Sequence, residues 1–177
     1  MNVKQLLYGV PVAVVAVLMW GFYLFLQQGP PGALPSPLIG KPAPEFTLPA
    51  LDEQAQNFTR DELAKGKPTI INFFASWCTP CRVEHPALQA LAAKQGITLY
   101  GVDYKDTPQK AREFLSELGN PFGKINEDRS GRVAIDWGVT GVPETFVVDG
   151  NGVIRVHYAG PLSDDIIARL IMPALAK

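Results

Sequence analysis

The chain has 177 residues, a formal net charge of −1 and 47% hydrophobic residues. A net charge this close to zero gives no electrostatic reason to expect a nucleic acid as partner. The length suits one domain of ordinary size with an additional segment, and the uneven spread of apolar residues places that segment at the N-terminus.

Residues 6–26 are a run of 21 residues without a charged side chain. As a helix this run is about 30 Å long, the thickness of the hydrocarbon core of a bilayer. We therefore predict a transmembrane anchor over residues 6–26, preceded by a cytoplasmic N-terminus of residues 1–5. A cleaved signal peptide is the alternative, but its apolar region is usually about 7–15 residues long, and residues 27–31 make a poor cleavage site.

The orientation of this anchor follows from the positions of the basic residues. Lys4 precedes the apolar run, and the next basic residue is Lys41. The positive-inside rule keeps the N-terminus in the cytoplasm and exports the rest of the chain. In a bacterium this predicts a single-pass protein of the inner membrane, with its C-terminal domain in the periplasm, where disulfides persist.

The next segment, residues 27–39, is rich in proline and glycine. Such a composition favours an extended chain without a core of its own, so we interpret this segment as a spacer between the membrane and a folded domain. The domain is predicted to cover residues 40–177.

Within this domain the hydrophobic pattern alternates between strands and helices. Residues 69–75 are typical of a buried central strand, and residues 80–95 carry an apolar stripe at helical spacing. The other predicted strands lie at 97–102, 145–148 and 153–158, and the other predicted helices at 107–118, 131–137 and 164–175. The sequence Asp149–Gly152 (DGNG) is a strong hairpin signal between the last two strands. The order strand–helix–strand–helix followed by strand–strand–helix predicts an α/β sandwich, with a mixed sheet and helices on both faces.

Cys78 and Cys81 are the only cysteines of the chain, and they are predicted to lie where the first strand leads into the following helix. Backbone N–H groups and the helix dipole at this position stabilise a thiolate. Cys-x-x-Cys thiols have pKa values of roughly 3.5–7.5 in proteins, compared with about 8.5 for a free cysteine. We expect Cys78, the more exposed of the two, to attack a disulfide and Cys81 to resolve the mixed disulfide.

Three other interpretations of the cysteine pair are possible. A purely structural disulfide is disfavoured, because closing so short a loop removes little conformational entropy from the unfolded chain. A zinc site would need two more ligands, and only His85 and His157 are available as imidazoles. Inert core thiols fit poorly with the intervening Thr79 and Pro80. The redox interpretation is preferred, since this motif next to a strand–helix–strand pattern is typical of redox proteins.

The stretch Trp77–Cys81 (WCTPC), together with Thr140–Phe146 (TGVPETF) ahead of a strand, resembles the thioredoxin superfamily over residues 40–177. Within it, the chain is similar to the membrane-anchored thiol:disulfide interchange proteins of cytochrome c maturation, the CcmG/DsbE type. The further motifs that carry this resemblance are Ile39–Pro44, Cys81–His85, Tyr104–Asp106, Gly119–Pro121, Gly141–Phe146 and Asp149–Gly152.

The resemblance implies a thioredoxin-like domain in which Pro143 is cis and faces Cys78. It implies that the backbone of Val142 pairs with an extended substrate, and Trp77 is expected to offer a flat contact. The implied function is reduction of disulfides in apocytochrome c or in thiol proteins of haem ligation. A transmembrane thiol reductant transporter would be the electron donor, and no cofactor or metal is expected.

One position departs from ordinary thioredoxins, which hold a buried Asp six residues before the first Cys. This chain has Asn72 there, and an amide cannot titrate. We hypothesise that Glu84 and Glu144 handle protons and bias the choice of substrate, the alternative being two solvated surface acids. His85 is expected to be a surface residue, and Trp137, Phe73 and Phe74 to belong to the core.

Three alternative functions stay open at this point. The first is a general extracytoplasmic disulfide reductase or oxidant. The second, a thiol peroxidase, fits less well, because the local context of such a cysteine differs. The third belongs to another class, a metal-handling module that uses the cysteine pair and a histidine.

Overall fold

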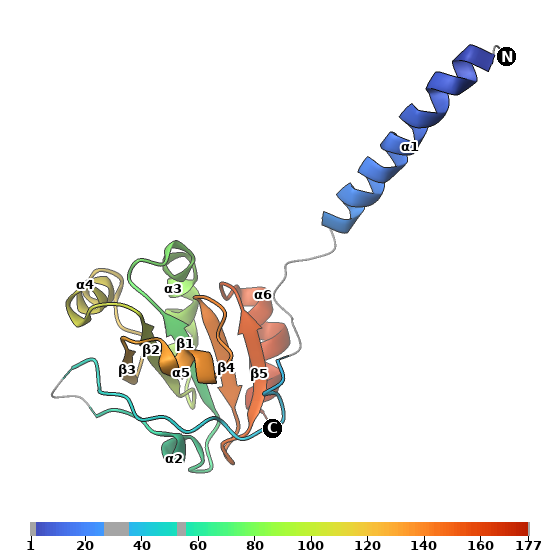
Figure 1. Ribbon diagram of the computed structural model, residues 1–177. Coiled ribbons are helices and arrows are strands. Elements are labelled where there is room, and N and C mark those ends of the chain that lie inside the picture. The colour runs from blue at the N-terminus through green and yellow to red at the C-terminus, as the bar shows by residue number, and fades with distance from the viewer. Residues whose placement is uncertain (1–2, 27–35, 53–55, 177) are drawn as a thin grey trace. The chain divides into compact units, whose positions relative to one another are not determined.

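The computed structural model describes residues 3–26, 36–52 and 56–176, and the chain divides into two units, Met1–Pro31 and Gly32–Lys177 (Figure 1). Most of the predicted spacer, residues 27–35, lies outside the described residues.

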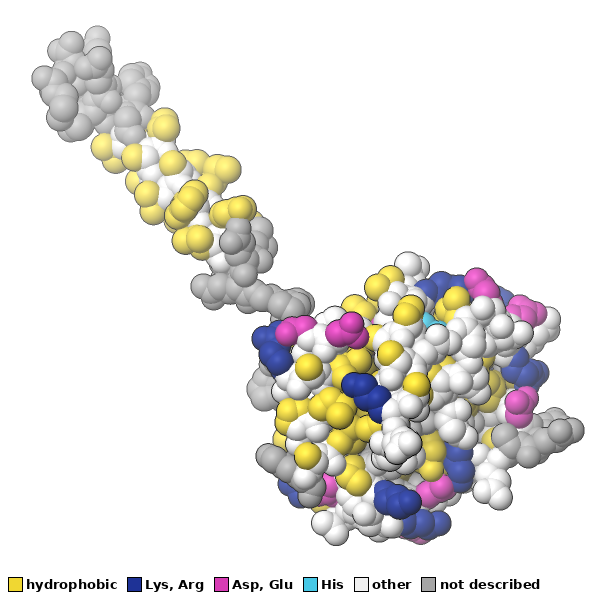
Figure 2. All heavy atoms as spheres, turned by 180° about the vertical axis from the view of Figure 1, so that it is seen from behind, with side chains coloured by type: hydrophobic (Ala, Val, Ile, Leu, Met, Phe, Trp, Pro, Cys, Tyr) yellow, Lys and Arg dark blue, Asp and Glu magenta, His cyan; other side chains and the backbone are white. Residues whose placement is uncertain are grey.

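The first unit contains helix α1 (Val3–Leu26). Its described side chains, residues 10–24, are apolar or glycine on all sides, without an acidic or basic group among them (Figure 2). Among the described residues, no helix combines the length and apolarity that a bilayer crossing requires.

The second unit is built around a five-stranded sheet with the order β3-β2-β1-β4-β5. The strands β1, β2 and β3 run parallel, whereas β4 is antiparallel to both β1 and β5. The strands are β1 (Thr69–Phe74), β2 (Leu99–Tyr104), β3 (Lys124–Asp128), β4 (Glu144–Val148) and β5 (Ile154–Ala159). The predicted mixed sheet and the hairpin at Asp149–Gly152 are confirmed. Asp149 stabilises that hairpin by accepting hydrogen bonds from the amides of Asn151 and Val153.

Both faces of the sheet are covered, as the sequence predicts (Figure 1). One face packs against α3 (Thr79–Ala92), α4 (Pro108–Leu118) and the C-terminal helical segment. The opposite face packs against α5 (Arg132–Asp136), Trp137 and apolar side chains of the segment that precedes β1. Phe73 and Phe74 point to opposite faces of β1 and are both buried, so the prediction that they belong to the core is confirmed, as it is for Trp137.

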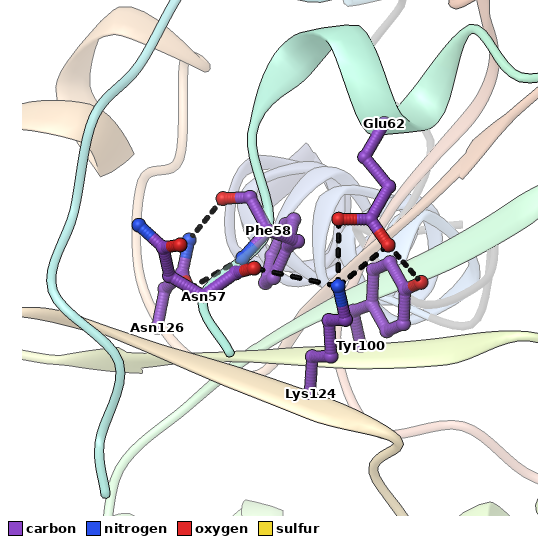
Figure 3. Close-up of polar contacts among 6 residues, drawn as sticks. All are labelled: Asn57, Phe58, Glu62, Tyr100, Lys124 and Asn126. Carbon is purple, nitrogen blue, oxygen red and sulfur yellow. Dashed lines mark hydrogen bonds and ion pairs between the residues drawn. The ribbon is translucent and has the colours of Figure 1, made fainter. Parts of the chain in front are cut away.

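Strand β3 is absent from the sequence prediction. Its sequence, Lys-Ile-Asn-Glu-Asp, has a low β propensity. The strand forms because tertiary contacts satisfy its polar groups: the side chain of Asn126 accepts from the amide of Phe58 at 3.1 Å and donates to its carbonyl at 2.7 Å (Figure 3). Its outer edge is covered by the segment that contains Ala50, which bridges to Asn126.

The short helix α2 (Arg60–Leu63), also not predicted, is tied to the same part of the sheet. Lys124 of β3 donates to both carboxylate oxygens of Glu62 at 2.7 and 2.8 Å, and Tyr100 of β2 donates to the same carboxylate at 3.0 Å (Figure 3). Every polar group of this cluster has a protein partner, so the cluster is structural.

The predicted C-terminal helix over 164–175 is present but is not a uniform α-helix. It consists of α6 (Asp164–Ile166), a π-helical turn η1 (Ile167–Ile171) and α7 (Met172–Leu175). The change precedes Pro173, whose nitrogen cannot donate to the carbonyl four residues earlier. The apolar side chains Ile167 and Ile171 still face the sheet.

Candidate functional site

The redox turn, which we define as Ala75–Cys81, connects β1 to α3. Cys78 is the N-cap of α3, and its sulfur accepts a hydrogen bond from the amide of Cys81 at 3.1 Å. The two cysteines form a disulfide, with their Cα atoms 5.3 Å apart. The turn places Cys78 where the unpaired N–H groups and the dipole of α3 favour a negative charge.

Both cysteines are nearly buried, with Cys78 3% exposed and Cys81 2% exposed. Cys78 is the more exposed of the two, as expected, but only by a small margin. The neighbours Thr79 and Pro80 are exposed, and Trp77 is 57% exposed. A reacting disulfide thus meets Trp77 and the exposed turn before it reaches a sulfur.

The second part of the site is the loop before β4. The Val142–Pro143 peptide bond is cis, and the carbonyl oxygen of Val142 lies 3.4 Å from the sulfur of Cys78. Residues 64 positions apart in the chain therefore meet at the sulfur. In the dithiol form, this carbonyl is positioned to accept a hydrogen bond from the Cys78 thiol.

Glu144 fixes the loop that carries Val142. The Glu144 carboxylate accepts hydrogen bonds from the amide and hydroxyl of Thr140, both at 2.7 Å, from the amide of Gly141 at 3.0 Å, and from His157. Burial raises the pKa of Glu144, but the hydrogen bonds from His157, Thr140 and Gly141 outweigh it, so the pKa lies below its ordinary value. Glu144 is therefore an ionised, fully occupied acceptor.

Glu84 lies on α3, three residues after Cys81. Asn72 donates to one of its carboxylate oxygens at 2.9 Å, and the amide of Leu162 donates to the other at 2.8 Å. Burial raises the pKa of Glu84 to about 7 and outweighs these two hydrogen bonds. Glu84 can therefore gain or lose a proton near neutral pH.

Both acids are only 1% exposed, so the alternative of two solvated surface acids is wrong. The sequence identified both residues from the resemblance, but it could not reveal their surroundings. Their donors Leu162 and Thr140 are distant from the cysteines in the sequence, and Leu162 belongs to no motif.

The two histidines do not meet at the cysteines. His85 is buried, contrary to expectation, and its Nε2 atom lies 2.7 Å from the carbonyl oxygen of Gly119. His157 pairs with Glu144 and stacks on Phe146 at 4.1 Å between ring centroids. In the part of the chain that the structure describes, no three His, Cys, Asp or Glu side chains gather to hold a metal ion.

Two residues that the sequence reasoning left without a role hold the redox turn. Asp106 accepts a hydrogen bond from the amide of Ser76 at 2.6 Å, and the carbonyl of Lys105 accepts one from the indole N–H of Trp77 at 3.2 Å. Both belong to the motif Tyr104–Asp106, which supported the resemblance. The motif could have drawn attention to these two residues, but only the tertiary structure shows that they bind Ser76 and Trp77.

This arrangement is suited to thiol–disulfide exchange. It combines a cysteine at the N-terminus of a 14-residue helix, a second cysteine able to close a disulfide with it, and an exposed aromatic side chain beside them. The thiolate is the attacking species in such exchange, and a helix N-terminus favours it.

Comparison with known proteins agrees with this chemistry. The family model described as the AhpC/TSA family matches residues 39–157. The chain is 47% identical over 166 residues to the thiol:disulfide interchange protein HelX of Rhodobacter capsulatus, covering 94% of this chain and 93% of the relative. It is 43% identical to the thiol:disulfide interchange protein DsbE of Escherichia coli K12, covering 94% and 89%.

A solved structure shows the same fold. The crystal structure of a protein from Chlorobium tepidum, provisionally named as a thiol:disulfide interchange protein DsbE, superposes with a TM-score of 0.65 and 27% sequence identity. The match covers 77% of this chain and 97% of that structure.

Proposed function

The chain belongs to the AhpC/TSA family and is a thiol:disulfide oxidoreductase of thioredoxin-like fold, and from this premise we propose that it reduces disulfides of apocytochrome c or of thiol proteins that serve haem ligation. The observation that carries the reaction type is the Cys78–Cys81 pair at the N-terminus of α3. The substrate class rests on the resemblance of the sequence motifs to proteins of cytochrome c maturation.

In the proposed reaction, the thiolate of Cys78 attacks one sulfur of the substrate disulfide and releases the other substrate sulfur as a thiolate. Cys81, as a thiolate, then attacks the sulfur of Cys78 in the mixed disulfide, which releases the second substrate thiolate. The substrate gains two electrons, and the protein is left with the disulfide Cys78–Cys81. A transmembrane thiol reductant transporter is proposed to return the two electrons.

We assign Glu84 the proton-handling role, because Cys81 must lose a proton before it can attack. Glu84 lies three residues after Cys81 on α3, and its pKa is raised by burial to about 7. Such a value lets a carboxylate accept a proton near neutral pH. Glu144 is proposed to act on substrate choice instead, because its hydrogen bonds fix Thr140 and Gly141 next to Val142.

Substrate binding is proposed to involve three residues that surround Cys78. Trp77 offers an exposed ring, and Val142, half-buried ahead of Pro143, offers backbone groups beside the sulfur of Cys78. An extended peptide could pair with that backbone as an added strand.

The proposed anchor is the apolar segment 6–26, with the oxidoreductase domain exported to the periplasm of a bacterium. Support comes from the sequence, in which these 21 residues carry no charged side chain and would measure about 30 Å as a helix. Retention of the full-length chain in membranes after alkaline carbonate washing, with the domain open to protease from the periplasmic side, would support it. A soluble product that begins after residue 26 would identify a cleaved signal peptide instead.

A rate comparison tests the substrate. The reduced full chain is mixed with an oxidised peptide that carries a Cys-x-x-Cys-His haem-attachment sequence, and separately with a peptide of the same composition whose disulfide lies in a scrambled sequence. Preference for the first by about 10-fold or more is expected, while equal rates would indicate a general disulfide reductase. Equilibration with glutathione gives the direction: a potential more negative than about −240 mV is expected of a reductant.

A further inference from the structure

The redox turn is held from outside by the short segment that follows β2. Asp106 binds the amide of Ser76, and the carbonyl of Lys105 binds the indole of Trp77. Ser76 and Trp77 directly precede Cys78, so the position of the attacking sulfur depends on where Lys105 and Asp106 lie. Asp106 also accepts from the amide of Thr107 at 2.7 Å, which ties it to the start of α4.

The backbone of this segment adopts an uncommon conformation. Lys105 has a φ of +47°, in the left-handed region that residues other than glycine rarely adopt. Its amide donates to the carbonyl of Asp128 on β3 at 3.0 Å. A residue in this region is strained and persists where its surroundings fix it, often at functional sites. The segment Lys105–Asp106 that binds the redox turn is thus fixed in turn by a hydrogen bond to strand β3.

A second acid, Asp103, lies on β2 three residues before Asp106. It is opposite Phe74, the last residue of β1, and is therefore next to the start of the redox turn. Asp103 is 0% exposed, and neither of its carboxylate oxygens has a hydrogen-bond partner among the described residues. A buried carboxylate without a donor is costly, whereas the protonated acid is not charged. Burial, followed by the charges of Asp106 and Glu127, raises the pKa of Asp103 to about 8.

The charged groups around Asp103 do not offset its charge. Glu127 is its neighbour in register on β3 and pairs with Arg129, and β1 contributes no charged residue. The arginines of the two helices on this face are engaged elsewhere, in the pairs Arg82–Glu117 and Arg112–Asp52. Glu84 of α3 faces Asn72 and Leu162. No described basic group pairs with Asp103.

We propose that Asp106 and Asp103 form a positioning pair for the redox turn, in which Asp106 holds Ser76 and a neutral Asp103 keeps a second negative charge away from Asp106 and the Cys78 thiolate. Loss of the Asp103 proton places a buried charge beside Asp106, which weakens its hold on the turn and disfavours a thiolate nearby. The pair rests on disulfide exchange by Cys78 and Cys81 and is independent of the natural substrate.

The test measures the rate at which the reduced full chain, kept in detergent, reacts with glutathione disulfide between pH 6 and pH 10. Asp103→Asn, an uncharged variant of similar shape, should match the wild type below pH 7 and be about 5-fold faster above pH 8. Asp106→Asn should be about 10-fold slower at pH 7, because the turn is less well positioned. In the wild type, the rate should fall at alkaline pH as Asp103 loses its proton. In Asp106→Asn this fall should begin at lower pH, because removing the negative charge of Asp106 lowers the pKa of Asp103. Asp165→Asn, an exposed matched control on α6, should follow the wild type throughout.

A measurement on the wild-type chain makes the test independent of variant folding. NMR of carboxyl carbons should show Asp103 titrating near pH 8 and the indole N–H resonance of Trp77 shifting with the same midpoint. Titration of Asp103 in the ordinary carboxylate range, an indole resonance that ignores this titration, or coincident rate profiles for wild type and Asp103→Asn would overturn the pair. Absence of any reaction in the wild type would overturn the exchange chemistry itself and the pair with it.

Discussion

The side-chain amide of Asn72 donates a hydrogen bond to the carboxylate of Glu84 at 2.9 Å, so that β1 and α3 share a buried polar contact beneath the redox turn. Asn72 also donates to the hydroxyl of Thr145 at 3.1 Å. The strand position therefore carries an amide that cannot titrate, and the titratable group sits one helical turn after Cys81 instead. In this chain the buried acid closest to this contact is therefore on the helix, at Glu84, and the strand carries an amide.

The first prediction concerns the protonation of Glu84. Because its folded-state pKa is raised to about 7 from 4.5, the native protein holds a proton that the unfolded chain releases between these pH values. Stability of the wild type should thus fall as pH rises from about 4.5 to 7, by at most on the order of 3 kcal/mol from this residue. Glu84→Gln has no titrating group at this position, so its stability should not fall in this way. The free energy of unfolding of the variant relative to the wild type should therefore increase from pH 4.5 to 7. Urea unfolding of both chains at pH 5, 6 and 7 measures it, and a pH-independent difference would contradict it.

The second prediction concerns the loop held by Glu144. Burial would raise its pKa, but its hydrogen bonds, that from His157 first, lower it, so its contribution to stability is present at neutral pH and is lost as pH falls through the folded pKa. Glu144→Gln should lower the free energy of unfolding at pH 7 by about 3 kcal/mol, because several buried donors lose a charged acceptor. This difference between variant and wild type should become smaller at acidic pH, where Glu144 of the wild type is protonated. Glu117→Gln, whose carboxylate is 61% exposed, is the control and should change stability by less than about 0.5 kcal/mol.

The third prediction assigns the attacking and resolving sulfurs. Cys81→Ser should accumulate a mixed disulfide with a peptide substrate, because Cys78 can attack but nothing resolves the product. Cys78→Ser should form no such complex, because the proposed substrate-binding backbone of Val142 lies beside the sulfur of Cys78 and Cys81 lies three residues further along α3. Non-reducing electrophoresis with mass spectrometry of the trapped species distinguishes the two variants. Equal trapping by both would show that the assignment is wrong.

A fourth prediction separates substrate binding from chemistry at Trp77. Its ring is 57% exposed, so Trp77→Ala should alter the free energy of unfolding by less than about 1 kcal/mol. The KM for a peptide disulfide should rise several-fold, while the rate with glutathione disulfide, too small to cover the ring, should change less. Val83→Ala is a suitable control, since Val83 is also exposed on α3. Equal losses for both substrates would point to a disturbed redox turn.

The fifth prediction tests the packing that supports the site. A Cβ atom at Gly101 of β2 would lie 2.9 Å from the ring of Phe74 and 3.0 Å from that of Phe122. These rings stack at 4.9 Å between centroids, on the face of the sheet that also carries the cysteines. Gly101→Ala should destabilise the domain by about 1–3 kcal/mol through overpacking. Thermal unfolding compared with Gly123→Ala measures this. Gly123, like Gly101, has no positive φ, but a Cβ atom there would meet only ordinary contacts at 3.7 Å or more, so it controls for the loss of glycine without overpacking.

Much of the fold follows from local patterns in the sequence. The apolar runs, the Asp149–Gly152 turn and the helical stripe of α3 determine the strands β1, β2, β4 and β5 and their helices, because side-chain periodicity reports which face is buried. Strand β3 was not predicted, because its burial depends on the hydrogen bonds between Asn126 and Phe58, which are 68 residues apart in the chain. Polar residues that are satisfied only by distant partners leave no periodic signal.

The sequence by itself identified the reactive pair, since Cys78 and Cys81 lie only three positions apart and their spacing, next to a strand–helix–strand pattern, favours redox chemistry. Only the tertiary structure decided which residues surround that pair and in what state of protonation. The fold buries Glu84 against Asn72, surrounds Glu144 with donors, places Val142 at the sulfur of Cys78, and sets Asp103 beside the turn without a hydrogen-bond partner among the residues that the structure describes. The physical reason is that a cysteine's identity is local, whereas the pKa of a carboxyl depends on desolvation and on partners that only the folded chain brings together.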